Sequence, residues 1–403
     1  MSNTSVANYP GSIEIEEVLH DNGNNTEDIT KLVLLIDINS DVDISSSFCE
    51  ITIADYKNWL EKRQFGPGDV VSFTVKHSDI SYERKYRIKS INDMLNLENG
   101  RTYKLKLVSE LEYMSFHVKI SKAFSGKPSE IAKTILQQHT FERPDIWEPS
   151  VNNISYIAPA ISPIETIDWL ARNSYTNEMN SRMVFFQDSK QFWNFTSIEK
   201  LRSVYDGTTT YRYGANTLST KGGVPNQEAL IYEIQTIRYP ENSFDIYKEL
   251  KKGNIKNTFF TLDPTNKLLS VNNYDYWNDY SSKALNTTKA WKKENLGVGK
   301  ITTSYATSYS TTIPEFRIMY DASDDGFRIT GSQMIEISVP GNHLVDIGQI
   351  ITIEIPSQEA TVSSSDLKLD GTWSGKYYVI GKRDQITNEG HGMALRLVKD
   401  SFI

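Results

Sequence analysis

Apolar and polar residues alternate in several runs within the first 110 residues of the chain. The runs are Leu32–Ile38, Cys49–Ile53, Val70–Val75, Tyr86–Ile91 and Tyr103–Val108. A period of two places successive side chains on opposite faces of a strand. Gly66-Pro67-Gly68 and Glu98-Asn99-Gly100 contain the residue types of tight turns. The pattern therefore predicts a set of β-strands joined by short connections.

Two later segments have helical periodicity instead. Ser129–Gln138 follows Pro128 and carries its apolar residues on one side of a helix. The second helix is expected to begin at Ser162-Pro163-Ile164-Glu165 and to run to about Asn173. There the Ser162 side chain can cap an amide of the first turn while Glu165 reaches back to the cap.

Strands resume after these helices, so the middle of the chain is predicted to be α+β. Strands are expected at Met183–Gln187 and Gln191–Phe195, and Asp188-Ser189-Lys190 provides a short hairpin turn between them. Residues 246–324 are rich in Asn, Thr, Ser, Tyr and Lys without a clear period, and are interpreted as an inserted domain with long loops. The last strands are expected at Arg317–Tyr320, Met334–Val339, Gln349–Ile355, Tyr377–Gly381 and Met393–Val398.

The first and last strand sets repeat each other in order. Gly68–Val75 parallels Gly348–Ile355 at an offset of 280, Lys85–Ile88 parallels Tyr377–Ile380 at 292, and Leu105–Val108 parallels Leu395–Val398 at 290. The change in offset places roughly a dozen extra residues in the loop that contains Ser363-Ser364-Ser365, because loops tolerate insertions. Two similar β domains per chain would give a trimer six similar domains around one axis.

These features resemble the baseplate hub protein of T-even-type contractile phage tails, whose relatives include the hub part of the type VI secretion spike protein. The resemblance covers nearly the whole chain. It is carried by the strand set Leu32–Glu110, by the helix at Ser162-Pro163-Ile164-Glu165 leading to Arg182–Asp188, and by the segment from Tyr377 to Val398.

The resemblance implies a mainly β fold with α+β insertions, made of two similar antiparallel β-barrel domains plus two smaller domains. The first barrel would be residues 1–112 and the second would combine 222–245 with 325–403; residues 113–221 would form the α+β domain and 246–324 the inserted domain. It also implies a homotrimer with a central channel for DNA in transit, which binds the tail tube or tube-initiation proteins on one side and a spike protein trimer on the other. No oligonucleotide-fold domain or Gly-rich β-helix repeat follows the hub region, so the spike is expected to be a separate chain.

Composition and charge limit other functions. Hydrophobic residues make up 38% of the chain, enough for packed cores, and the length of 403 residues favours two to four domains. The formal net charge of -8 argues against tight sequence-independent DNA binding, and suits a channel wall that must not retain DNA. The N-terminus lacks a basic start followed by an apolar stretch, and no run of about 18 apolar residues occurs, so no membrane insertion is expected. We expect assembly in the host cytoplasm and a final location in the virion.

Candidate chemistry is sparse, and no catalytic residue, cofactor or metal ligand is assigned. No metal-site spacing joins the histidines, which are His20, His77, His117, His139, His343 and His391. Gly297-Val298-Gly299-Lys300 lacks the upstream glycine of a phosphate loop. The carboxylates Glu14, Glu16 and Glu17, and the pair Asp324-Asp325, are interpreted as solvated surface rather than glycosidase residues. Cys49 is expected to be a packed thiol, because a single cysteine has no disulfide partner.

Two aromatic clusters leave alternatives open. Tyr274-Asp275-Tyr276-Trp277 and Phe192-Trp193-Asn194-Phe195 are suited to core packing, to a subunit or spike interface, or to stacking on sugars. The main hypothesis is a non-enzymatic structural hub. The alternatives are a tail-associated enzyme that degrades cell wall or glycan, and a glycan-binding module.

Overall fold

The computed structural model describes the chain from Gly11 to Ile403 with several gaps. The described residues are 11–63, 65–77, 80–140, 142–176, 183–205, 207–214, 220–221, 224–225, 230–240, 247, 250–251, 255–264, 267–275, 278, 284–289, 300–305, 333–357 and 368–403. Within them the fold is mainly β with α+β insertions, which confirms the predicted class.

The N-terminal part is built from strands that follow the predicted alternation, with two short helical segments. They are β1 (Glu14–Asp21), β2 (Thr26–Asp28), the 3-10 helix η1 (Thr30–Leu32), β3 (Val33–Asp41), β4 (Ile44–Asp55), α1 (Trp59–Arg63), β5 (Val70–His77), β6 (Ile80–Leu97) and β7 (Gly100–Val108). All five strands predicted here are confirmed. Strand β1 was missed by the sequence analysis.

The C-terminal part adds a second set of strands. They are β13 (Thr210–Tyr213), β14 (Thr220–Lys221), β15 (Val224–Pro225), β16 (Glu233–Ile234), β17 (Thr236–Arg238), β22 (Gln333–Pro340), β23 (Ile350–Glu354), β24 (Gly375–Thr387), β25 (Gly390–Lys399) and β26 (Ser401–Phe402). Four of the five late strands predicted are confirmed. The fifth, Arg317–Tyr320, lies outside the described residues, as do Ser363-Ser364-Ser365.

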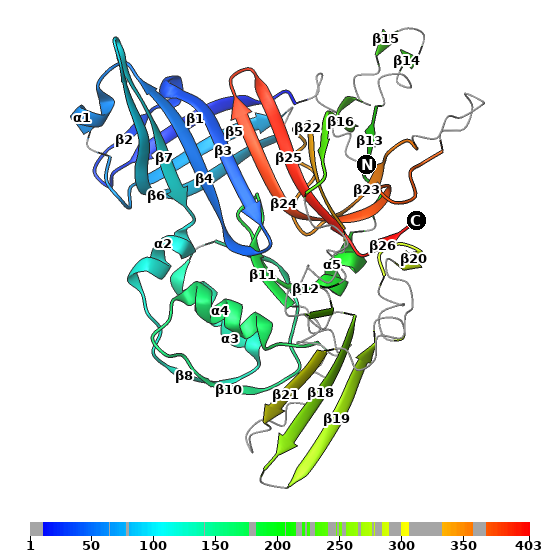
Figure 1. Ribbon diagram of the computed structural model, residues 1–403. Coiled ribbons are helices and arrows are strands. Elements are labelled where there is room, and N and C mark those ends of the chain that lie inside the picture. Colours follow the sequence, from blue (N-terminus) through cyan, green and yellow to red (C-terminus); the bar gives the residue numbers. More distant parts are fainter. Residues whose placement is uncertain are drawn as a thin grey trace.

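Both parts share one sheet. It has 14 strands, and its main path runs β16-β13-β23-β24-β3-β4-β7-β6-β5-β1-β2, with β22 and β25 completing the C-terminal part and β17 pairing with β22. Figure 1 shows the blue N-terminal strands and the orange and red C-terminal strands side by side, meeting at β3 and β24.

The expected closed barrels are not seen among the described residues, where β2 does not pair with β3 and β16 does not pair with β17. In the N-terminal part, β1 pairs with β2, but the 3-10 turn η1 separates β2 from β3. In the C-terminal part, Gln235 separates β16, which pairs with β13, from β17, which pairs with β22. Each set is therefore curved and open, and β3 is left to pair with β24.

The internal repeat is confirmed by the order of strand pairing. We call β3-β4-β7-β6-β5 the first unit and β17-β22-β25-β24-β23 the second unit; both are antiparallel throughout and have the same sequence order. Both also have a bulge at the matching place, at Lys89 in β6 and at Ile380 in β24. The turn before β5 is repeated as well, since the N–H of Gly68 donates to Ile88 O and the N–H of Gly348 to Val379 O, both at 2.8 Å.

One part of the predicted alignment was wrong by a residue. Val70 lies opposite Arg87, and Ile350 lies opposite Tyr378, so the β6 and β24 strands match at an offset of 291 rather than 292. This offset pairs Tyr86 with Tyr377, which are 1% and 0% exposed. The sequence alignment placed identical side-chain types together, whereas the bulges fix the true register.

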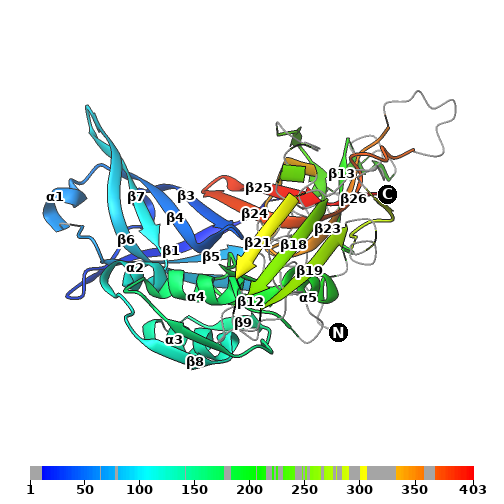
Figure 2. The same cartoon turned by 60° about the horizontal axis from the view of Figure 1, so that its bottom comes forward.

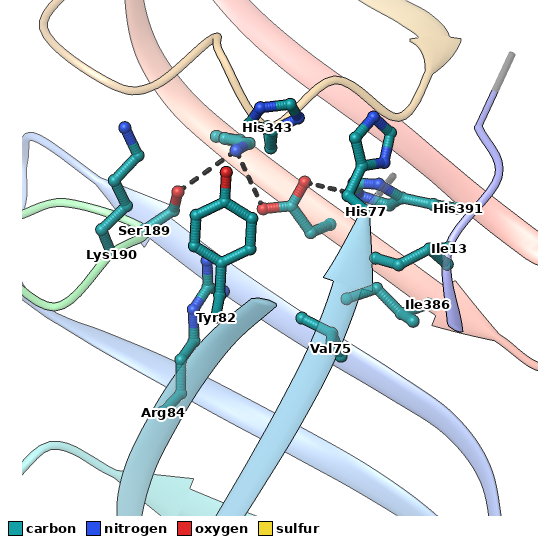
Figure 3. Close-up of a pocket in the computed structure, with 12 residues that line it drawn as sticks. Ile13, Val75, His77, Tyr82, Arg84, Ser189, Lys190, His343, Ile386 and His391 are labelled. Atoms are coloured by element: carbon teal, nitrogen blue, oxygen red, sulfur yellow. Dashed lines mark hydrogen bonds and ion pairs between the residues drawn. The ribbon is translucent and has the colours of Figure 1, made fainter. Parts of the chain in front are cut away.

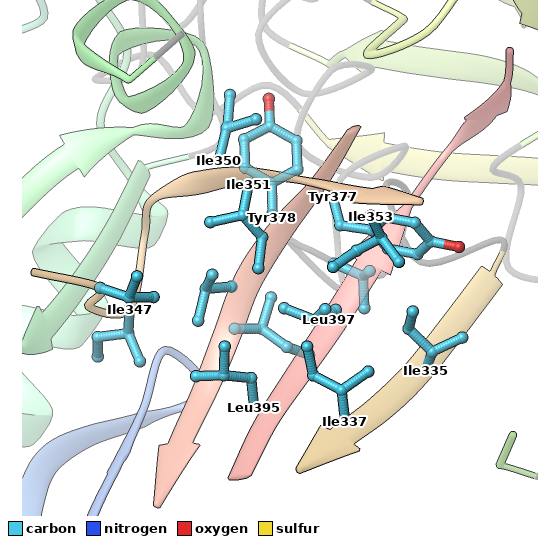
Figure 4. Close-up of a cluster of buried hydrophobic side chains, with 14 of the residues drawn as sticks. Ile335, Ile337, Ile347, Ile350, Ile351, Ile353, Tyr377, Tyr378, Leu395 and Leu397 are labelled. Atoms are coloured by element: carbon cyan, nitrogen blue, oxygen red, sulfur yellow. The ribbon is translucent and has the colours of Figure 1, made fainter. Parts of the chain in front are cut away.

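Each unit has its own apolar core. The first is formed by side chains such as Ile36, Phe73 and Leu105, and also takes in Ile386 from β24. The second contains Ile337, Ile353 and Leu397, which Figure 4 shows converging between the strands, and takes in Val42 from the β3–β4 turn. Each core thus includes a residue from the other unit.

The α+β part between the units is confirmed and packs a third core. Its elements are α2 (Glu110–His117), β8 (Ala123–Gly126), α3 (Pro128–His139), β9 (Pro144–Trp147), β10 (Ile154–Ile157), α4 (Pro163–Arg172), β11 (Met183–Gln187), β12 (Trp193–Ser197) and α5 (Ile198–Val204). The predicted capping box is present, because Ser162 Oγ accepts from the Glu165 N–H and the Glu165 carboxylate accepts from the Ser162 N–H. Figures 1 and 2 both place α3 and α4 on one side of the large sheet.

The polar region 246–324 contains a small sheet that sequence periodicity did not reveal. Strand β18 (Lys256–Asp263) pairs antiparallel with β19 (Leu268–Asp275) and parallel with β21 (Lys300–Tyr305), while β20 (Thr288–Lys289) pairs with β26. None of the helices in the described part of the chain combines the length and apolar character that a membrane span requires.

The repeated glycine turn provides a test of the fold. Gly348 has φ +82°, and a Cβ there would lie 3.0 Å from Phe186 Cζ. We expect Gly348→Ala to lower the free energy of unfolding by about 1–3 kcal/mol, because the left-handed backbone is costly for alanine. Urea unfolding measures the change. The matched control is Gly371→Ala, where no atom lies within 4 Å of the added Cβ; equal losses in the two variants would contradict the interpretation.

Candidate functional site at the junction of the two units

Strand β24 of the second unit also pairs with the first unit. One of its edges pairs with β25 from Tyr378 to Thr387. Its other edge pairs with β23 through Gly375–Tyr378 and then with β3 through Gly381–Ile386. A single strand therefore joins the two sheets by main-chain hydrogen bonds.

Ion pairs support this junction on the solvent side of β24. Arg383 Nε lies 3.0 Å from both carboxylate oxygens of Asp37 on β3, and Arg396 pairs with Asp41. The hydrogen bond to Asp37 raises the pKa of Arg383. Burial raises the pKa of Asp41, although Arg396 opposes the change. These contacts connect β3 to Arg383 of β24 and to Arg396 of β25.

The buried face of β24 carries a charged cluster, drawn in Figure 3. Lys382 Nζ lies 3.1 Å from Asp384 Oδ2, and His391 Nε2 lies 2.8 Å from Asp384 Oδ1. Burial alone would raise the pKa of Asp384, but the Lys382 ammonium and the His391 hydrogen bond outweigh it and hold the pKa well below its usual range. All three side chains are less than a tenth exposed.

Three histidines from distant parts of the sequence meet around this cluster. His77 ends β5, His391 begins β25, and His343 follows β22; the rings of His77 and His343 have centroids 4.5 Å apart. Burial, followed by the positive charges of His77, Lys190 and Lys382, lowers the pKa of His343 to about 4. Burial also lowers the pKa of His77. The enclosed space has a volume of about 20 Å³, room for about one water molecule.

The β11–β12 hairpin of the α+β part contacts both units at the same place. Ser47 Oγ of β4 donates to Gln187 Oε1 at 2.8 Å, and the main chain of Lys85 exchanges two hydrogen bonds with the Gln191 side chain. On the other side, Ser189 Oγ donates to Asp346 at 2.7 Å, and Lys382 Nζ donates to Ser189 Oγ. The turn Asp188-Ser189-Lys190 is thus a connection between three parts of the molecule.

A second small cavity, of about 100 Å³, lies beneath this turn. Its lining includes Asp188, Asp346 and Tyr205. Burial and then the charge of Asp346 raise the pKa of Asp188 to about 7. The backbone N–H groups of Lys190 and Phe192 donate to Asp188 Oδ1, so the carboxyl holds the turn in shape.

The other sequence candidates lie apart from this junction. His20 contacts Asp69, while Glu14, Glu16 and Glu17 lie on β1. Trp193 and Phe195 are core residues, 0% exposed, as is Cys49. Residues 276–277, 297–299 and 324–325 lie outside the described residues.

The possible chemistry of the junction depends on which ionisable side chains lie close together. Within the described ranges, no group of three or more His, Cys, Asp or Glu side chains is placed to hold a metal ion. The His77, His343 and His391 cluster was missed by the sequence analysis because its members are far apart in the chain and share no spacing. The three histidines belong to a buried polar network at the junction of the two units. We interpret this network as holding the neighbouring side chains in place.

Comparisons with solved structures show that this fold occurs in phage tail proteins. The 43 kDa tail protein of prophage MuSo2 from Shewanella oneidensis has a TM-score of 0.59 and 11% identity, covering 97% of this chain and 100% of that one. The tail protein from Neisseria meningitidis MC58 has a TM-score of 0.57 and 11% identity, covering 95% and 96%. The prophage tail protein gp18 from Listeria monocytogenes EGD-e has a TM-score of 0.51 and 10% identity, covering 96% of each chain. No protein-family model matches the sequence, and no curated protein matches it. The chain therefore has a fold found in tail proteins over nearly its whole length.

The histidine cluster predicts a specific pH dependence. Because the pKa of His343 falls from 6.5 to about 4 on folding, the unfolded chain binds more protons between these pH values. The free energy of unfolding should therefore decrease as the pH falls from about 6.5 to about 4. We expect His343→Gln to reduce this decrease in urea unfolding followed across that range.

The matched control is His117→Gln, at an exposed position outside the cluster. It should retain the pH dependence of the original protein. An unchanged pH profile in His343→Gln would contradict the assignment.

Proposed function

We propose that this chain is a structural subunit of the baseplate hub of a contractile phage tail, located in the virion and assembled in the host cytoplasm. Three chains would form a ring with pseudo-six-fold symmetry and a central channel. The observation that carries the proposal is the duplicated unit: a chain with two units of the same strand order gives a trimer six such units. The fold shared with tail proteins over nearly the full length of the chain supports its placement in a phage tail.

We propose four domains within each chain. Residues 1–112 would provide one tube-like domain, 222–245 with 325–403 the other, 113–221 the α+β domain and 246–324 the inserted domain. The first core lies in residues 1–112 apart from Ile386, and the third core lies within Leu111–Phe195. The second core crosses the proposed boundaries, because it also takes in Phe186, Ile198, Leu201 and Tyr211 from 113–221 and Leu285 from 246–324. The two tube-like domains are curved open sheets rather than closed barrels.

We propose that one face of the ring binds the tail tube or tube-initiation proteins and that the other binds a spike protein trimer. DNA would pass through the channel without being held, consistent with the net charge of -8. The proposed role is structural and uses no cofactor. Glycan stacking by Trp193 and Phe195 is not supported, because both side chains are buried in the core of the α+β part.

The mass of the purified protein tests the proposal. Light scattering should give three times the chain mass of 45.9 kDa, and negative-stain images of the same peak should show rings with a central hole. We expect the trimer to be held together by a large apolar interface of the kind found in obligate oligomers. A monomer both alone and when co-produced with the candidate spike protein would contradict the proposal.

A further inference from the structure

Inside one chain, a strand of the first unit pairs with a strand of the second unit. Each of these two strands has a counterpart in the other unit, and an edge of each counterpart is left available. Inside the chain, β3 of the first unit pairs with Gly381–Ile386 of β24 in the second unit. The repeat matches β3 to β17, and Gly381–Thr387 to Ser90–Leu97 of β6. Within the described residues, β22 is the strand that pairs with β17, and β7 is the strand that pairs with Ser90–Leu97. The outer edges of β17 and of this part of β6 therefore have no strand partner there.

We infer that β17 of one subunit pairs antiparallel with β6 of the next subunit. This pairing between chains would have the same arrangement as the pairing of β3 with β24 within a chain. This inference rests on the proposed ring and identifies the strands that close it. The matching pairs predict the register: Arg238 takes the place of Asp37, and Leu95 takes the place of Gln385. Arg238 is therefore expected opposite Leu95, and Thr236 opposite Leu97.

The surface of β6 fits an edge that is covered in the assembly. Met94, Leu95 and Leu97 are 48%, 63% and 57% exposed. Figures 1 and 2 both show this end of the β6–β7 hairpin projecting from the sheet. Unpaired strand edges with exposed apolar side chains favour pairing with another strand. At the corresponding junction inside the chain, Ile386 is 2% exposed in the core of the first unit.

The charges at the proposed pairing between chains have the opposite signs to those at the pairing within the chain. Inside the chain, Asp37 of β3 faces Arg383 of β24. Between chains, the position of Asp37 is occupied by Arg238, and the position of Arg383 by Asn92, next to Asp93. Arg238 and Asp93 have exposed side chains, at 80% and 64%, and each also has a partner inside the chain, Glu336 at 3.4 Å and Lys104 at 2.8 Å. The sign reversal favours β17 on β6 and opposes β3 on β6, where Asp37 would meet Asp93.

A cross-linking experiment tests the pairing. The only native cysteine, Cys49, is buried, so new thiols at exposed positions form disulfides selectively. The double variant Leu95→Cys/Arg238→Cys should give disulfide-linked species of two and three chains on a non-reducing gel, after mild oxidation of the assembled protein. The single variants Leu95→Cys and Arg238→Cys should stay at the mass of one chain or form no more than a minor dimer.

The matched control places the same cysteine pair at the junction inside the chain. Asp37→Cys/Gln385→Cys should lose two reactive thiols on oxidation without a change in mass, because these residues lie opposite each other in one chain. Circular dichroism melting establishes that each variant is folded before oxidation.

A second set of variants tests the charge reversal. Asp93→Arg and Arg238→Asp should each raise the concentration at which the assembly half dissociates by roughly two- to five-fold, since exposed ion pairs contribute little. Asp93→Arg combined with Arg238→Asp should restore the original value.

The outcomes separate this inference from the proposed function. Covalent trimers in the cysteine double variant, with restoration by the charge double variant, support the pairing. A trimer by light scattering that neither cross-links nor responds to the charge variants overturns the pairing and leaves the proposed hub intact. A protein that stays monomeric, alone and with the candidate spike protein, overturns both.

Discussion

Main-chain hydrogen bonding along the second edge of β24 is the constraint on which the rest of the structure depends. Because Gly381–Ile386 pair with β3, the strands of the first unit cannot close on themselves, and the two units become one sheet. Each backbone hydrogen bond contributes about 1 kcal/mol. The pairing also sets the positions of the side chains that cross it, with Ile386 entering the first core and Arg383 meeting Asp37.

The buried charges at this junction follow from the same pairing. Lys382, Asp384 and Ile386 alternate toward the interior, so the strand that brings an isoleucine into the first core also brings a lysine and a carboxylate to the boundary between units. A buried charge needs a partner, and here Asp384 is satisfied by Lys382 and His391. The β11–β12 hairpin then adds Ser189 to the Lys382 ammonium, which ties the α+β part to both units. Relative movement of the three parts would separate these charges, so the junction is expected to be rigid.

Local features of the sequence were sufficient to predict much of this fold. Alternation predicted β3 to β7, the capping box placed the start of α4, and the repeat identified strands that occupy equivalent places. Features that depend on contacts between residues far apart in the sequence could not be predicted. Nothing near His77, His343 or His391 signals that they meet, and the offset of 291 follows from the pairing of β5 with β6 and of β23 with β24, which the sequence does not show. Closure into barrels was implied by the resemblance, and the strand patterns themselves do not show which edges pair. The small sheet β19-β18-β21 escaped because its strands lack a clear apolar–polar period.

The two units also differ in the connection that follows their matching strands β5 and β23. Strand β6 begins three residues after β5 ends, at Ile80 after His77, whereas β24 begins at Gly375 after β23 ends at Glu354. In a ring of three chains, this longer connection would occur at every second of the six unit positions. A bound trimer could then distinguish alternate positions, and would settle in three equivalent rotational settings around the axis where a uniform ring would offer six. In the proposed ring, the insertion would thus set a rotational phase, by which the orientation of a bound trimer about the axis is fixed.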